Sequence, residues 1–263
     1  MSQRVIAIIQ ARMNASRLPG KVLLDLEGAT VLERVCERVN KSHMVQQVMV
    51  ATTTNPDDRA IIKLCDQRGI SSFCGSENDV LDRYYRAAQK VLAGHIVRIT
   101  ADCPLMDPLV IDKIVTAHLQ TGSDYTSNTL KDTYPDGEDV EVMTFACLQK
   151  NWEQAEFNSE REHVTSYVKK HPEIFKLTSI ACEEDLSENR WTMDNAEDYV
   201  FLKAVYKALF PRNPCFGMRD VLDLIKDQPR LKRINQGIIR NEGYLKSIQN
   251  DKRVPSSANP GEK

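Results

Sequence analysis

The chain has 263 residues, of which 41% are hydrophobic and 27% are charged, an ordinary composition for a globular enzyme. This length suits one large α/β domain, or one domain with an appendage. The net charge of -2 excludes a global basic field of the kind that binds nucleic acid. The seven cysteines are scattered without a Cys-x-x-Cys pair, so neither a zinc knuckle nor a disulfide framework is predicted.

The start of the chain lacks the cationic stretch and the small-residue cleavage site of a secretory signal. No apolar run approaches the roughly eighteen residues that a membrane-spanning helix needs. Scattered thiols suit a reducing compartment. We therefore expect a cytoplasmic protein that does not bind membranes.

Strand and helix patterns alternate along the chain. Val5 to Gln10 is a short apolar run rich in β-branched residues, typical of a buried central strand. The further expected strands are 45–52, 70–74, 95–100, 123–128, 138–143 and 175–181, with a strand end at 190–194; the expected helices are 31–41, 60–69, 109–121, 148–155 and 199–209, with others opening at 80 and 159. This alternation predicts a single α/β domain with a mostly parallel, doubly wound sheet.

The strand 138–143 alternates acidic and apolar residues, so we expect it to be half-exposed, with Asp139 and Glu141 on one face. Past residue 210, short helical pieces are expected at 216–225 and 228–246. We divide the chain into a domain at 1–210, a C-terminal helical extension at 211–250 and a disordered tail at 251–263.

The segment Ala11 to Lys21 follows the first strand and has no apolar periodicity, so it should be a loop. It carries three cations, Arg12, Arg17 and Lys21. Loops at the carboxyl ends of parallel strands are where α/β sheets bind ligands, and cations with backbone N–H groups suit a polyphosphate. The alternative is a solvated basic turn.

Asp102 follows the predicted strand 95–100 and should face the same crevice as this loop. A carboxylate beside a triphosphate requires a cation between them, and Mg²⁺ binds through a few carboxylates plus substrate phosphates. The alternative is an Asx-turn before Pro104. Asp107 is interpreted as the cap of the next helix.

The loop reads Gln-Ala-Arg-Met-x-x-x-Arg-Leu-Pro-Gly-Lys from Gln10 to Lys21. It resembles the signature loop of the cytidylyltransferases that make CMP-activated acidic sugars, the acylneuraminate and Kdo cytidylyltransferase family. The form is closest to the spore-coat polysaccharide branch, from which it departs at Asn14-Ala15, where Gly-Ser is frequent. The resemblance covers roughly Arg4 to Phe210.

Further segments resemble this family: Gly-Ser-x-x-Asp-Val-Leu-Asp-Arg-Tyr from residue 75, Arg-x-Thr-x-Asp-Cys-Pro-Leu from 98, Asp-Val-Glu-Val from 139, Arg-Glu-His-Val-Thr from 161 and Trp-Thr-x-Asp from 191. Glu138 replaces a usual leucine and Ser166 a usual proline. From residue types alone, each segment also has a structural interpretation: helix caps for Ser76 and Asp194, a capping box for Ser159 with Glu162, and a solvated face for Asp139 with Glu141.

The resemblance implies a nucleotide-diphospho-sugar transferase-like fold, a projecting dimerisation arm at about 130–170, and a homodimer. It implies that CTP and an acidic sugar, with a nonulosonic acid favoured over Kdo, give a CMP-sugar and pyrophosphate with Mg²⁺. The catalytic candidates are Arg12, Lys21, Asp102 and Asp194, the last two as metal ligands; the nucleotide-binding candidates are Ala11, Arg12, Ser16, Arg17, Lys21, Thr53, Ser76 and Asp79; the sugar-site candidates are Asp139, Glu141, Glu162 and His163.

Two alternatives remain open. A nucleotide-sugar-dependent glycosyltransferase would share the fold, but it usually carries an Asp-x-Asp metal motif, which this sequence lacks. A non-catalytic nucleotide-binding partner in polysaccharide assembly is the other alternative, against which the intact Lys21, Asp102 and Asp194 argue.

Overall fold

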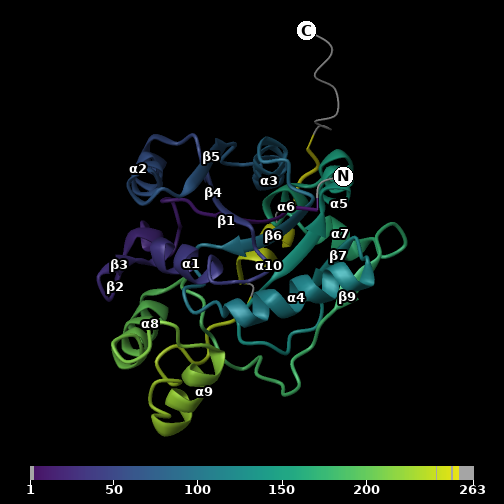
Figure 1. Ribbon diagram of the computed structural model, residues 1–263. Helices are drawn as coiled ribbons and strands as arrows, with labels where there is room; N and C mark the ends of the chain where they lie inside the picture. The colour runs from purple at the N-terminus through teal and green to yellow at the C-terminus, as the bar shows by residue number, and fades with distance from the viewer. Residues whose placement is uncertain (1–2, 241, 250, 255–263) are drawn as a thin grey trace.

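The first strand, β1 (Val5–Gln10), lies inside a sheet that organises the whole chain (Figure 1). The computed structural model describes residues 3–240, 242–249 and 251–254. Within them the main sheet has seven strands in the order β5-β4-β1-β6-β8-β7-β9. The other strands are β4 (Gln47–Thr53), β5 (Ser71–Gly75), β6 (His95–Thr100), β7 (Tyr125–Ser127), β8 (Glu141–Thr144) and β9 (Leu177–Ser179).

Apart from β8, the strands of this described sheet run parallel to one another. β1 pairs in parallel with β4 on one side and with β6 on the other. β8 is antiparallel to both of its neighbours, β6 and β7. The expected mostly parallel α/β domain is therefore confirmed.

Successive side chains of β1 pack into two different cores, as the alternation of a strand requires. Ala7 and Ile9 pack with α1 (Val31–Val39), α2 (Arg59–Arg68) and α4 (Pro108–Thr121). Ile6 and Ile8 pack on the other face with α3 (Val80–Lys90) and α5 (Phe145–Gln154). Both faces of the sheet are covered, which is why the central strand β1 reads as a continuous apolar run as far as Gln10.

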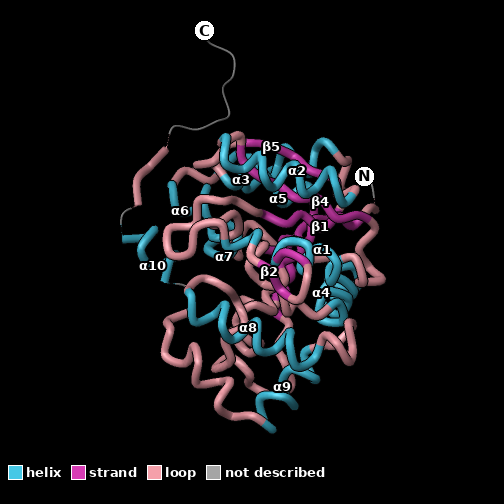
Figure 2. Tube along the Cα trace, turned by 90° about the vertical axis from the view of Figure 1, so that its left-hand side faces the viewer, coloured by secondary structure: helices cyan, strands magenta, loops and turns pink. Residues whose placement is uncertain are grey.

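A third core lies under the sheet layers, where α8 (Ala196–Leu209) and α9 (Met218–Asp227) lie together in both views (Figures 1 and 2). Trp191 and Leu26 are buried in this core. Leu26 belongs to a small hairpin, β2 (Asp25–Leu26) and β3 (Ala29–Thr30), that the sequence did not predict. Residues beyond 210 thus complete a core to which Leu26, shortly after the signature loop, also belongs.

The segment 130–170 is not a projecting arm in the described structure. It supplies β8 to the interior of the sheet and then forms α5, α6 (Asn158–Glu162) and α7 (Ser166–Lys170). The expectation of an arm was wrong because this segment supplies a strand to the sheet and many of its apolar residues, such as Val142 and Met143, are fully buried. Its role in dimerisation stays a prediction.

Two strand assignments also need correction. The strand expected at 138–143 begins only at Glu141, and its residues are buried rather than half-exposed. The strand expected to end at Asp194 is absent from the described structure, where Arg190 makes only an isolated bridge to Asp136. The backbone there lies against the turn at Gly137, which has a φ of +113°. A Cβ added at Gly137 would lie 2.7 Å from backbone atoms of Trp191 and Thr192, so the close approach requires glycine.

The C-terminal part differs from the expected helical run at 228–246. Residues 228–240 form turns, and α10 (Glu242–Gln249) follows. In the region expected to be a disordered tail, Asp251 accepts hydrogen bonds from the backbone and hydroxyl of Ser159 at 2.9 and 2.6 Å, while 255–263 lie outside the described residues. The boundaries 1–210, 211–250 and 251–263 stay predictions.

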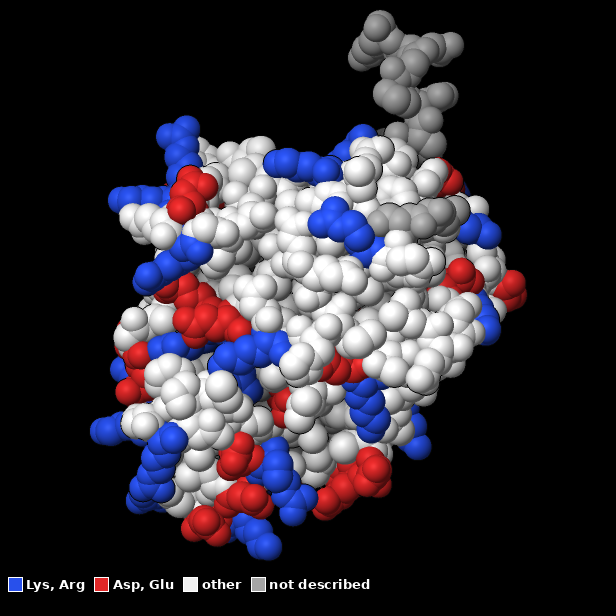
Figure 3. Space-filling view, in the orientation of Figure 1, with Lys and Arg blue, Asp and Glu red and all other residues white. Residues whose placement is uncertain are grey.

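The surface carries interspersed charges of both signs (Figure 3), in keeping with the net charge of -2. In the described ranges, none of the helices combines the length and the apolar character needed to cross a bilayer.

A buried histidine pair makes the fold sensitive to acid. His118 of α4 lies 3.0 Å from His95 of β6 and 3.1 Å from the Thr126 hydroxyl. Burial and the neighbouring His95 lower the pKa of His118 to about 4. His118 therefore binds a proton more readily in the unfolded chain than in the folded one. The stability that the folded protein gains from keeping His118 neutral is fully present above about pH 6.5 and is lost as the pH falls toward 4.

We therefore expect the free energy of unfolding to fall by about 2 kcal/mol between pH 7 and pH 5 through this group. Urea titrations at both pH values measure it. His118→Gln should remove this share of the pH dependence, whereas His43→Gln, at an exposed histidine, should keep it. Equal pH dependence in His118→Gln and the wild type would contradict the assignment.

Candidate active site

Two adjoining cavities open at the carboxyl ends of β1 and β6. The first, of about 330 Å³, is lined by the signature loop and by α3. The second, of about 440 Å³, is lined by β8, α7 and the segment leading into α10. They share Gln10, Arg17, Arg98, Thr100, Asp102, His163, Asp194 and Gly243, so a ligand can span both.

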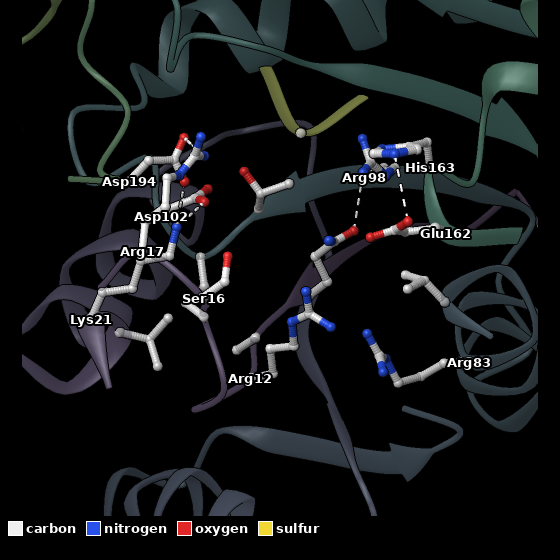
Figure 4. Close-up of a pocket in the computed structure, with 18 residues that line it drawn as sticks. Arg12, Ser16, Arg17, Lys21, Arg83, Arg98, Asp102, Glu162, His163 and Asp194 are labelled. Carbon is white, nitrogen blue, oxygen red and sulfur yellow. Dashed lines mark hydrogen bonds and ion pairs between the residues drawn. The ribbon is translucent and has the colours of Figure 1, made fainter. Parts of the chain in front are cut away.

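Lys21 joins three segments that are far apart in sequence (Figure 4). Its Nζ donates to Asp102 Oδ2 at 2.7 Å, to Asp194 Oδ1 at 2.8 Å and to the Met193 carbonyl at 2.7 Å. The Asp102 carbonyl in turn accepts from the Met193 N–H at 2.8 Å. The prediction that Asp102 and Asp194 lie together is therefore met in space, although Asp194 follows a loop and not a strand.

Burial disfavours the charged form of Lys21, but the charges of Asp102 and Asp194 outweigh it and raise the pKa of Lys21. Burial likewise disfavours the Asp102 carboxylate, and the Lys21 ammonium outweighs it and lowers the pKa of Asp102. Lys21 and Asp102 are thus held in their charged forms near neutral pH.

Asp194 is surrounded by further cations. Its second oxygen pairs with Arg17 at 2.9 Å and with Arg190 at 3.2 Å. Asp198 accepts from the backbone N–H groups of Asp194 and of Asn195, the N-cap of α8. Asp198, rather than Asp194, therefore provides the carboxylate that caps this helix, so the Asp194 side chain faces the cavity.

Arg12 and Arg83 carry positive charge that no nearby carboxylate neutralises directly. Both line the first cavity (Figure 4), and Arg12 has no ion-pair partner among the described residues. Arg83 donates to the Ser76 carbonyl at 2.6 Å, while its buried Nε has no partner in the described structure. Burial and the neighbouring Arg12 lower the pKa of Arg83, which indicates a site that an anion would stabilise.

The predicted nucleotide contacts fall into two groups. Ala11, Arg12, Ser16, Arg17 and Lys21 line the first cavity. Thr53, Ser76 and Asp79 lie outside the lining of both large cavities, because their side chains are used elsewhere: Thr53 donates to Asp58, Ser76 accepts from the Asp79 N–H, and Asp79 caps α3 and pairs with Arg161.

Glu141 lies at the second cavity, but it is buried and saturated with donors rather than solvated. Its oxygens accept from Tyr125 at 2.5 Å, Thr165 at 2.6 Å and Lys169 at 2.8 Å, and from Arg98. Burial would raise the pKa of Glu141, yet the two cations lower it.

Asp139 also lines the second cavity, where it pairs with Arg240 at 2.8 Å. Burial raises the pKa of Asp139 to about 7, against the opposing charge of Arg240. The neighbouring Glu138 is fully buried beside the Asp107 backbone N–H, and burial raises its pKa well above the usual range. Glu138, which stands where the resembling family usually has leucine, is therefore buried, and burial favours its neutral form.

Glu162 and His163 line the first cavity from α6 and the residue after it. Both contact α10: Ser247 donates to Glu162 at 2.9 Å, and His163 lies 3.0 Å from the Ser247 hydroxyl. The expected Ser159–Glu162 capping box was wrong, because Glu160 accepts from the N–H of Phe157, the actual N-cap. Asp107 does cap α4, as predicted.

Several cations of the site were missed in the sequence. These are Arg83, Arg98, Lys169, Arg190 and Arg240. Arg98 could have been found, since it alternates with Thr100 along β6, and Asp102 follows the end of that strand. Lys169 and Arg240 gave no local signal.

The fit of a divalent metal can be judged from the carboxylates present. Asp102 and Asp194 already share one cation, and their oxygens are the hard donors that Mg²⁺ prefers. In the described ranges there is no cluster of three or more protein ligands that could hold a metal alone. The residues fit a metal that takes its remaining ligands from a bound polyphosphate and water.

Comparison with known proteins shows which proteins the chain is similar to. Residues 6–228 match the family model described as Cytidylyltransferase. The chain is 37% identical to the uncharacterized protein MJ1063 of Methanocaldococcus jannaschii over 92% of this chain and 98% of that protein. It is 32% identical to the spore coat polysaccharide biosynthesis protein SpsF of Bacillus subtilis, over 86% and 95% of the two chains.

A solved cytidylyltransferase from Leptospira borgpetersenii superposes with a TM-score of 0.85 at 34% identity, covering 91% of this chain and all of that one. The match to the family model extends over most of the sequence and includes Lys21, Asp102 and Asp194. These findings confirm the resemblance of the signature loop and disfavour the glycosyltransferase and non-catalytic alternatives. The chain belongs to the cytidylyltransferase family and is a CTP-dependent nucleotidyltransferase.

Proposed function

We propose that the protein transfers CMP from CTP to the anomeric hydroxyl of an acidic sugar, a nonulosonic acid in preference to Kdo, for surface polysaccharide synthesis. The observation that supports this most is the Lys21 ammonium between Asp102 and Asp194, at the junction of the two cavities. This junction is the place where a triphosphate in one cavity meets an acceptor in the other.

The triphosphate is assigned to Arg12, Arg17 and Lys21, with Ala11 and Ser16 beside them in the first cavity. Arg83 is added to this set because it lines the same cavity as Arg12 and the positive charges of the two side chains repel each other. Such cations offset the negative charge that builds on pyrophosphate as it leaves. Asp139, Glu162 and His163 remain sugar-site candidates at the two cavities.

Asp102 and Asp194 would hold Mg²⁺ together with the phosphates. When bound, the metal would polarise the α-phosphate and lower the pKa of the attacking hydroxyl. The acceptor oxygen forms a bond to the α-phosphorus, the bond from that phosphorus to pyrophosphate breaks, and the hydroxyl proton is lost. The protein's part is positioning and charge neutralisation, not covalent chemistry.

A homodimer is expected from the resemblance and a cytoplasmic location from the sequence, and both stay predictions. Analytical ultracentrifugation of the full chain would test the first.

The function is tested by pyrophosphate release with each nucleoside triphosphate and a panel of acceptors. We expect release with CTP, magnesium and an acidic sugar, and little with ATP, GTP or UTP. A glycosyltransferase would consume a sugar nucleotide without releasing pyrophosphate, and a binding partner would do neither. Faster release with UTP than with CTP would refute the cytidylyl assignment.

Lys21 is predicted to contribute mainly to turnover. Lys21→Met should lower kcat by about 10²–10³, the scale for losing a preorganised charge contact in the transition state. Lys63→Met, at an exposed lysine on α2, is the control and should behave as wild type. A Lys21→Met protein with unchanged kcat would remove Lys21 from the reaction.

Asp102 and Asp194 are predicted to act as one unit. Asp102→Asn and Asp194→Asn should each lower activity by at least about 10², and the double variant should be little worse than the poorer single one, because groups that act together are non-additive. The magnesium concentration for half-maximal rate should rise in both single variants. Asp185→Asn, at an exposed position, is the control. Additive losses with normal magnesium dependence would contradict a shared metal site.

A further inference from the structure

The second cavity contains a local excess of positive charge that the reaction described so far does not use. Glu141 is the carboxylate between Arg98 and Lys169, and both cations line the cavity. The other three arginines there are outnumbered by acids: Arg17 pairs with Asp194 and Glu242, Arg240 with Asp132, Asp136 and Asp139, and Arg190 with Asp136, Asp194 and Asp198. Among the described residues that line this cavity, only the group formed by Glu141, Arg98 and Lys169 has more cations than carboxylates.

The geometry leaves donors on both cations uncommitted. Lys169 donates to Glu141 and to the Thr129 hydroxyl at 3.0 Å, and an ammonium has three donors. Arg98 uses Nη1 for Glu141 and Nη2 for the Gln10 side chain at 3.1 Å, while its buried Nε has no partner in the described structure. A ligand oxygen could therefore be bound without breaking the ion pairs to Glu141.

The chemistry of the proposed acceptor restricts where its carboxylate can lie. In a 2-ulosonic acid the carboxylate is attached to the anomeric carbon, whose hydroxyl attacks the α-phosphorus. A cation that binds this carboxylate must therefore lie where the two cavities meet. Arg17 and Arg98 are the cations of the described chain that line both cavities, and Arg17 is already paired with Asp194 and Glu242.

We propose that Arg98 and Lys169 bind the carboxylate of the acidic acceptor sugar, and that Glu141 is a positioning residue that holds these two cations in place. This inference rests on the proposed function, and it explains how the protein would select an acidic sugar over a neutral one. Glu141 itself does not contact the acceptor, because its oxygens are occupied by Tyr125, Thr165 and the two cations.

The test uses the full chain with CTP and magnesium, and two probe acids, N-acetylneuraminate and 3-deoxy-manno-octulosonate, each compared with its methyl ester. Lys169→Gln should raise the KM for the acid by about 10–100-fold, the scale of one lost charge-assisted hydrogen bond, with the KM for CTP within about threefold of wild type. It should also abolish the preference for the acid over the ester. A structural role alone would weaken both acceptors equally.

Lys170→Gln is the matched control, because Lys170 is the next residue on α7 and pairs with Glu160 instead. It should behave as wild type. Arg98→Lys is the second variant: it keeps the charge beside Glu141 but loses the planar set of donors, and it should also reduce the preference for the acid. This variant decides the question if Lys169→Gln does not fold.

The outcomes separate the two proposals. Wild-type turnover with an acid, together with an unchanged preference in Lys169→Gln and Arg98→Lys, would overturn this inference and leave the proposed function intact. Pyrophosphate release with neutral acceptors alone would overturn the proposed acceptor class and this inference with it.

Discussion

The Lys21 ammonium is the constraint on which the site depends. It binds two carboxylates and one carbonyl from segments that lie 81 to 173 positions away in the chain. One positive charge between two negative charges leaves a net negative charge, and buried carboxylates are costly unless each is paired. Arg17 and Arg190 supply the missing charge at Asp194. A triphosphate brought to this place adds more negative charge, so the arrangement itself creates a requirement for a further cation.

The parts of the fold that were predicted from sequence depend on local patterns. β1 is a continuous apolar run covered on both faces, and such a run is recognisable without knowledge of its partners. Parallel strands end at a common edge, so Asp102 and the signature loop could be placed together from strand order alone. Asp194 lies at the same edge but does not follow a strand. It belongs to a loop held by the Lys21 ammonium and by the hydrogen bond from the Met193 N–H to the Asp102 carbonyl.

The second cavity could not be predicted, because its charges are paired over long distances. An acidic residue at every second position is expected both for a solvated strand and for a strand whose acids are buried against cations. At Glu141 the cations come from β6 and α7, at Arg98 and Lys169, and nothing in the local sequence pairs either of them with Glu141. Glu138 shows the same limit: a charged residue type in place of leucine suggests exposure, whereas Glu138 is fully buried and its burial raises its pKa.

The uneven charge of the second cavity also determines how an acceptor would lie in it. With the carboxylate bound at Arg98 and Lys169, the rest of a sugar acid would extend toward Asp132, Asp136 and Asp139. Burial raises the pKa values of Asp136 and Asp139, so these acids are poorly compensated as anions and gain from donors brought by a ligand. Sugar hydroxyl groups are such donors. A carboxylate turned toward these aspartates would instead be repelled, so they disfavour the reversed orientation and keep the anomeric hydroxyl beside Asp102.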